Sequence, residues 1–167
     1  LAAGNTVVAK PSEITPMTAY IFSKICIEAG LPKGVLNIVH GLGSKVGDPL
    51  TTHIDTPIVS FTGGTVTGKH IASLTAPMFK KLSLELGGKN PNIIFADADF
   101  DKAVSIASRA AFTNQGQICL CGSRLFVQEE IYDKFKTALV AKASKLVVGN
   151  PKNPKTNLGA VVSKEHM

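Results

Sequence analysis

The alternation of short apolar segments with amphipathic segments constrains the fold of this chain most strongly. Strand patterns occur at 5–10, 34–43 and 57–64, and the first and third of them run into helical patterns. Glycines punctuate the turns that end the second and third strand patterns. This order predicts α/β layers built on a largely parallel sheet.

Segment 15–30 carries the clearest helix signals. Thr15 is suited to the N-cap, Pro16 to the first helical position and Gly30 to the C-terminal stop. Apolar residues recur between them at helical spacing. We therefore expect Cys26 in this helix to be a core thiol.

The alternation continues in the second half of the chain. Leucines alternate with polar residues over 82–86, which predicts a strand, and Asp99 is suited to the N-cap of the next helix. A further strand is expected at 123–128, followed by a long amphipathic helix over 129–147.

The glycine pair Gly87 and Gly88 interrupts this pattern and marks the expected domain boundary. We expect one partial domain over 1–87 and a second over 88–167. The chain of 167 residues begins almost at once in a strand and stops shortly after an apolar run. We therefore expect it to be a piece of a longer protein.

Composition excludes several classes of function. The net charge is +6, but the basic residues are scattered and the chain has no Trp and only two Tyr, so nucleic-acid binding is not expected. No apolar run approaches the roughly 20 residues that span a bilayer, and no secretory signal pattern is present. Three sparse cysteines predict a reducing, cytoplasmic setting without disulfides.

The turn "FTGGTVTG" contains Gly63, Gly64 and Gly68 before a helical pattern. Free N–H groups at a helix start suit a phosphate, although the spacing is not that of a G-x-G-x-x-G motif. Ordinary turn and close-packing glycines are the alternative. The residues alone leave both interpretations open.

Charged residues follow the first strand and end a later one. Lys10, Ser12 and Glu13 lie where open α/β sheets bind ligands, and Glu13 could bind ribose hydroxyls. Glu85 lies on the polar face of its strand, directly before glycines. In both places a solvated surface charge is the alternative.

Cys119 and Cys121 form a C-x-C pair. No second cysteine pair and no H-x₃₋₅-H pattern accompany them, so we expect no metal site. The spacing is also not the C-x-x-C of thioredoxin-like redox sites. A buried thiol pair and a nucleophile remain open, because no histidine lies near in the sequence to serve as a base.

Taken together, these segments resemble the NAD(P)-dependent aldehyde dehydrogenase superfamily along the whole chain. "ELGGKNPNIIF" resembles the glutamate signature of the family and "NQGQICLCGSR" its cysteine signature. "FTGG" is similar to the cofactor-domain turn, and "VVAKPSEITPMTA" is similar to the segment that holds the adenosine ribose. Within the family these segments resemble most the 2-aminomuconic semialdehyde dehydrogenase branch, and the hydroxymuconic semialdehyde and betaine aldehyde branches share parts of the pattern.

The resemblance implies roles for individual residues. Cys119 matches the nucleophile and Glu85 the general base, while Cys121 falls where the family does not require cysteine. The implied cofactor is NAD rather than NADP, because Glu13 would repel a 2′-phosphate. The implied cofactor-binding residues are Lys10, Ser12, Glu13, Gly43, Phe61, Thr62, Gly63, Gly64, Gly68, Leu86 and Gly87. Gly64 departs from the family pattern, which commonly has serine there.

The resemblance also implies a fold and a reaction. The expected fold is an incomplete Rossmann-like NAD-binding domain followed by the start of an α/β catalytic domain, about a third of a family member. The expected reaction is oxidation of an aldehyde to a carboxylic acid by way of a thiohemiacetal and a thioester on the cysteine. The partners would be an aldehyde and, in the full-length protein, further copies of itself. A truncated fragment that only binds cofactor or a partner is the alternative.

Overall fold

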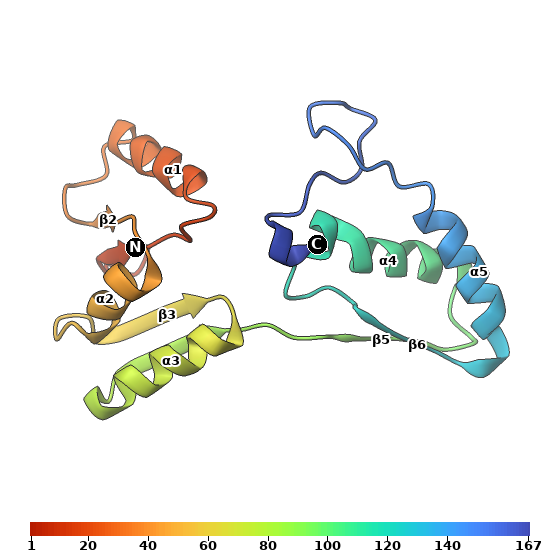
Figure 1. Ribbon diagram of the computed structural model, residues 1–167, viewed down its shortest axis with the longest axis horizontal. Coiled ribbons are helices and arrows are strands. Elements are labelled where there is room, and N and C mark those ends of the chain that lie inside the picture. Colours follow the sequence, from red (N-terminus) through yellow and green to blue (C-terminus); the bar gives the residue numbers. More distant parts are fainter. The chain divides into compact units, whose positions relative to one another are not determined.

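The computed structural model describes residues 1–167 and has a mixed α/β architecture. The chain forms two compact units, Leu1–Leu86 and Gly87–Met167 (Figure 1). The division falls one residue before the boundary expected from the glycine pair. None of the helices combines the length and the apolar character that a membrane crossing requires.

Helices and strands alternate in both units. The first unit contains β1 (Val7–Ala9), α1 (Met17–Glu28), β2 (Leu36–Ile38), α2 (Asp48–Thr52), β3 (Ile58–Thr62), α3 (Thr65–Thr75) and β4 (Lys81–Glu85). The second unit contains β5 (Pro91–Ile94), α4 (Phe100–Phe112), β6 (Arg124–Val127) and α5 (Tyr132–Ala143). Short 3₁₀ or π turns lie at 43–47, 76–78, 113–116, 129–131 and 164–166.

All strand pairs are parallel, as predicted, but they form three separate two-stranded ladders rather than one sheet. β1 pairs with β2, β3 with β4 and β5 with β6. In each ladder a helix connects the two strands, which is the crossover that parallel neighbours require. Residue Thr62 pairs with Glu85, so both strands of the second ladder end at one edge.

The helix predicted from segment 15–30 begins slightly later than expected. Pro16 is the N-cap, rather than Thr15, and no side chain caps the helix start. Gly30 ends the helix at φ +77°, as predicted. The expectation that Cys26 is a core thiol is wrong, because it is only half-buried and α1 has no buried residue. The helix packs mainly on β2, a three-residue strand that covers little of its apolar face.

The helices of the second unit agree more closely with the sequence pattern. Asp99 caps α4 as predicted, since its carboxylate accepts a hydrogen bond from the Lys102 N–H at 3.1 Å. The helix expected over 129–147 is shorter, because its first three residues form a 3₁₀ turn and α5 ends at Ala143.

A single cluster of buried side chains forms the core of the second unit. Ile94 from β5, Val104 and Ala107 from α4 and Phe135 from α5 meet there. The Phe135 ring is 1% exposed and meets the ring of Phe100 edge to face, with centroids 6.0 Å apart. The ladder of β5 and β6 is thereby joined to both helices.

We predict that Phe135→Ala will lower the free energy of unfolding of the second unit by about 3–5 kcal/mol, because it leaves a cavity in this core. Denaturant titrations followed by circular dichroism measure the change. Phe95→Ala is the matched control, since Phe95 lies in the same unit and is 62% exposed. Equal unfolding midpoints for the two variants would contradict the core assignment.

Candidate active site

The two cysteines of the C-x-C pair differ in accessibility. Both lie in the segment between α4 and β6, where Cys119 is exposed and Cys121 is buried, with 8% of its surface accessible. The side chain of Leu120 between them is 81% exposed. Of this pair, Cys119 is therefore the thiol that a dissolved reagent or substrate can reach.

A run of left-handed backbone leads into the cysteine segment. Asn114, Gln115 and Gly116 have φ values of +51°, +58° and +76°. Residues other than glycine seldom adopt this conformation, although Asn tolerates it better than most. The run reverses the chain after α4. It is tied to the C-terminal segment by Gln117, whose Oε1 accepts a hydrogen bond from the Val162 N–H at 3.1 Å.

Glu85 lies at the C-terminal end of β4, beside the glycine turn that follows β3. The Gly63 N–H donates a hydrogen bond to the Glu85 carbonyl oxygen at 3.0 Å, which continues the parallel ladder past Thr62. The Glu85 residue is exposed. Glu85 belongs to the first unit and Cys119 to the second.

The three glycines of the turn have different surroundings. A Cβ on Gly63 would lie 2.5 Å from the Phe61 ring, and a Cβ on Gly68 would lie 2.5 Å from a methyl carbon of Leu86. These two positions fit the close-packing interpretation. A Cβ on Gly64 would have open space around it.

Gly64 is the N-cap of α3, the helix that follows the turn. Its backbone is extended, at φ −71° and ψ 146°, and no side chain caps the 11-residue helix. The N–H groups of the first turn, which an Ncap side chain would satisfy in other helices, are therefore available to a ligand. An anion such as a phosphate group suits this position because the N-terminus is the positive end of the helix dipole.

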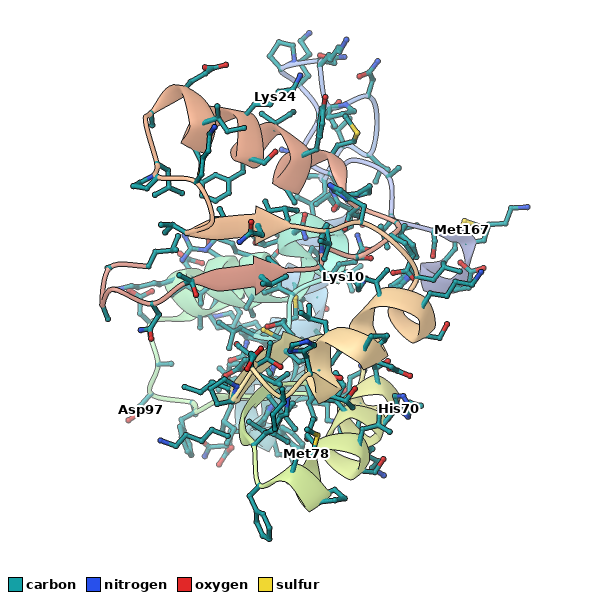
Figure 2. The ribbon with its side chains drawn as sticks, turned by 90° about the vertical axis from the view of Figure 1, so that its left-hand side faces the viewer. Lys10, Lys24, His70, Met78, Asp97 and Met167 are labelled. Atoms are coloured by element: carbon teal, nitrogen blue, oxygen red, sulfur yellow. The ribbon has the colours of Figure 1, made fainter.

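Lys10 and Glu13 form a hydrogen-bonded pair beyond the C-terminal end of β1. The Lys10 Nζ lies 3.3 Å from Glu13 Oε2 and also donates to the carbonyl oxygens of Pro11 at 2.7 Å and Gly41 at 3.2 Å. Figure 2 labels Lys10 just beyond the arrowhead of β1. The Lys10 side chain is 15% exposed, so its ammonium group is held in one place rather than free in solvent.

The pKa of Glu13 lies below its ordinary value. Its own backbone N–H is the larger cause, and the hydrogen bond and charge of Lys10 lower the pKa further. Ser12 supports the loop, since its Oγ accepts a hydrogen bond from the Ile14 N–H at 3.3 Å. Gly43 begins the π turn at 43–47, and the Lys10 side chain approaches Gly47 at the end of that turn.

An open, mainly apolar hollow of about 410 Å³ adjoins Glu13. The sequence pattern pointed to Glu13 but not to the other lining side chains, because these come from two segments far apart in the sequence. The lining residues are Pro11, Glu13, Pro16, Met17, Tyr20, His40 and Gly41. No group of three or more His, Cys, Asp or Glu side chains is arranged to hold a metal ion.

The same substitution at two glycines of α3 should have opposite effects. We predict that Gly64→Ser will stabilise the first unit by about 0.3 kcal/mol, because a serine oxygen at the N-cap accepts a hydrogen bond from a free backbone N–H of the first turn. Gly68→Ser should destabilise it by about 1–3 kcal/mol, because Leu86 has to move. Circular dichroism in denaturant measures both, and a stable Gly68→Ser variant would contradict the packing.

We predict that Lys10→Met will raise the pKa of Glu13 without restoring its ordinary value, because the backbone N–H remains. The interaction favours the ionised carboxylate, so it stabilises the loop at neutral pH and is lost as the pH falls through the Glu13 pKa. Carboxyl chemical shifts followed by NMR measure this pKa. Lys24→Met is the control, since Lys24 lies over the Tyr20 ring and should leave the Glu13 pKa unchanged.

Comparison with known proteins places this geometry in a family. The sequence profile of the aldehyde dehydrogenase family matches residues 1–167. The 2-aminomuconic semialdehyde dehydrogenase of Mus musculus is 52% identical over 167 residues, which are 100% of this chain and 34% of that protein. The betaine aldehyde dehydrogenase of Bacillus subtilis (strain 168) is 50% identical over 166 residues, 99% of this chain and 34% of that protein.

A solved structure gives the same result for the fold. The crystal structure of betaine aldehyde dehydrogenase from Staphylococcus aureus in complex with NAD+ matches with a TM-score of 0.94 and 47% sequence identity, over 99% of this chain and 33% of that one. The chain thus spans about a third of the length of the relatives it matches. On the family match over all 167 residues, the chain belongs to the aldehyde dehydrogenase family.

Proposed function

We propose that this chain carries the nucleophile, the general base and part of the cofactor site of an NAD-dependent aldehyde dehydrogenase. The observation that carries the proposal is the exposed Cys119 beside a buried Cys121, within a family match that covers the whole chain. The relatives are named for the oxidation of aldehydes. We propose that the aldehyde is oxidised to a carboxylic acid.

Cys119 would begin the reaction as a thiolate. Its sulfur attacks the carbonyl carbon of the aldehyde, a C–S bond forms, and the carbonyl oxygen takes up a proton to give a thiohemiacetal. Cys121 cannot take this role in the observed conformation, because its side chain is buried. The C-x-C pair is thus one nucleophile and one packed thiol.

The residues present fit a dinucleotide. Lys10 and Glu13 would hold the ribose hydroxyls, and the uncapped N-terminus of α3 would face the pyrophosphate. Glu13 favours NAD over NADP, because an ionised carboxylate repels a 2′-phosphate. When bound, NAD would accept the hydride that leaves the thiohemiacetal carbon, and release of the hydroxyl proton to solvent would leave a thioester on Cys119. A related betaine aldehyde dehydrogenase has been crystallised with NAD+.

Glu85 would complete the reaction as a general base. Its carboxylate removes a proton from water, the water oxygen adds to the thioester carbon, and the C–S bond breaks to release the acid and the thiolate. The exposed position of Glu85 at the end of β4 leaves its carboxylate accessible to water. Because Glu85 activates water, the thioester is hydrolysed rather than transferred to a second thiol.

The finer assignments rest on the same relatives. We place a partial NAD-binding domain at 1–87 and a partial catalytic domain at 88–167. The proposed substrate is 2-aminomuconic semialdehyde, because four of the relatives named for it are 49–52% identical to the chain. We propose a cytoplasmic, homo-oligomeric full-length protein.

A second candidate function is cofactor or partner binding without catalysis. The chain covers only 34% of the length of the Mus musculus relative. All but one of the proposed cofactor residues lie in the first unit. Binding of NAD measured by calorimetry, without NADH formation, would favour this candidate over the first.

We predict that Cys119→Ala in the full-length protein will abolish NADH formation from 2-aminomuconic semialdehyde or betaine aldehyde, measured by NADH absorbance. Glu85→Gln should form at most one equivalent of NADH per chain and keep an acyl group on Cys119, detected by intact mass. Cys26→Ser and Cys121→Ala are the controls and should keep turnover. Turnover by Cys119→Ala would contradict the assignment.

A further inference from the structure

The side chain of Asn90 bridges the two ends of the cysteine pair. Its Nδ2 donates a hydrogen bond to the Cys119 carbonyl oxygen at 2.5 Å and another to the Cys121 carbonyl oxygen at 3.2 Å. These three residues lie in the second unit. One amide group thus binds the backbone of the exposed and of the buried cysteine at the same time.

The backbone of Asn90 is itself fixed to the strand ladder. Its carbonyl oxygen accepts a hydrogen bond from the Arg124 N–H at 3.2 Å, one position before the Pro91 to Arg124 pair of β5 and β6. The amide therefore projects from the residue directly before β5, whose backbone is bonded to β6. When the backbone of a residue is fixed, its side-chain hydrogen-bond donor can hold a neighbouring segment in one position.

The cysteine segment has few other restraints near Cys119. Leu120 is 81% exposed and so contributes little packing. The backbone bonds of the segment are those of Cys121 N–H to the Ile118 carbonyl at 3.0 Å, Ser123 N–H to the Cys121 carbonyl at 2.9 Å and Gly122 N–H to the Ala110 carbonyl at 3.1 Å. The first closes the turn 118–121 around Cys119 and Leu120, and the other two restrain the C-terminal side, but none of them ends on the Cys119 carbonyl oxygen. The Asn90 amide is the restraint that reaches the carbonyl of Cys119 itself.

An amide donor suits this arrangement. The two N–H groups of an asparagine Nδ2 can reach two carbonyl oxygens together, whereas an aspartate of the same shape has no donor when ionised. Loss of the donor would remove the Asn90 bond to the Cys119 carbonyl oxygen and would leave the Cys121 carbonyl oxygen with the Ser123 N–H alone, which loosens the turn around the two cysteines. The side chain of Cys121 could then rotate out of its buried position.

We propose that Asn90 is a positioning residue that keeps Cys119 exposed and Cys121 buried. The functional part of the proposal rests on the assignment of Cys119 as the nucleophile, and it extends that assignment by naming the group that selects between the two thiols. Asn90 acts through the backbone of the loop and touches neither the sulfur nor the substrate.

The test is thiol labelling of the 167-residue chain with iodoacetamide, followed by peptide mass spectrometry. Asn90→Asp and Asn90→Ala should each raise the labelling rate of Cys121 about tenfold or more, the factor that corresponds to one or two lost hydrogen bonds. Cys26 is the internal reference, and Asn153→Asp, which keeps the acceptor for the Lys155 N–H, is the matched control. The assay needs neither aldehyde nor NAD, so it is independent of the proposed catalytic activity.

Hydrogen exchange of the same variants separates a local effect from unfolding. The amides of Cys121 and Gly122 should lose protection, while those of α4 and β6 keep it. Unchanged Cys121 labelling in both variants would overturn the proposal. So would equal loss of protection throughout α4, or an increase in Asn90→Asp alone, which would trace the effect to the added charge.

Discussion

The parallel pairing of strands is the constraint on which the rest of this structure depends. A parallel ladder places the C-terminal ends of both strands at one edge, and a helix has to connect them. In the ladder of β3 and β4, this brings the glycine turn next to Glu85. In the ladder of β5 and β6, the pairing continues at the opposite end, where the Arg124 N–H donates to the Asn90 carbonyl oxygen. The side chain of Asn90 then binds the cysteine segment.

Small residues and backbone groups carry much of the proposed site. Gly63 and Gly68 allow aromatic and aliphatic side chains to approach the backbone closely, and Gly64 leaves the start of α3 open. The Lys10 ammonium is held by two carbonyl oxygens as well as by Glu13. These features are stabilised by packing and hydrogen bonds within the first unit, and the start of α3 has no side-chain cap.

Much of the local structure could be predicted because it depends on neighbouring residues. The Asp99 cap and the Gly30 stop follow from side-chain oxygen chemistry and from the φ freedom of glycine. The burial of Cys26 could not be predicted in this way. Helical spacing shows that a face is apolar, whereas burial depends on what packs against it, and β2 covers little of α1. The three separate ladders also depend on tertiary contacts rather than on strand patterns.

The sequence by itself determined the parallel α/β class and the family resemblance, from which the proposed roles of Cys119, Glu85, Lys10 and Glu13 follow, because these depend on the kind and order of residues. Only the tertiary structure decided which cysteine is exposed and which group holds it. Asn90 lies inside a recognised motif, yet its side chain contacts residues far along the chain. Such a contact depends on the path of the backbone between them, which no local pattern encodes.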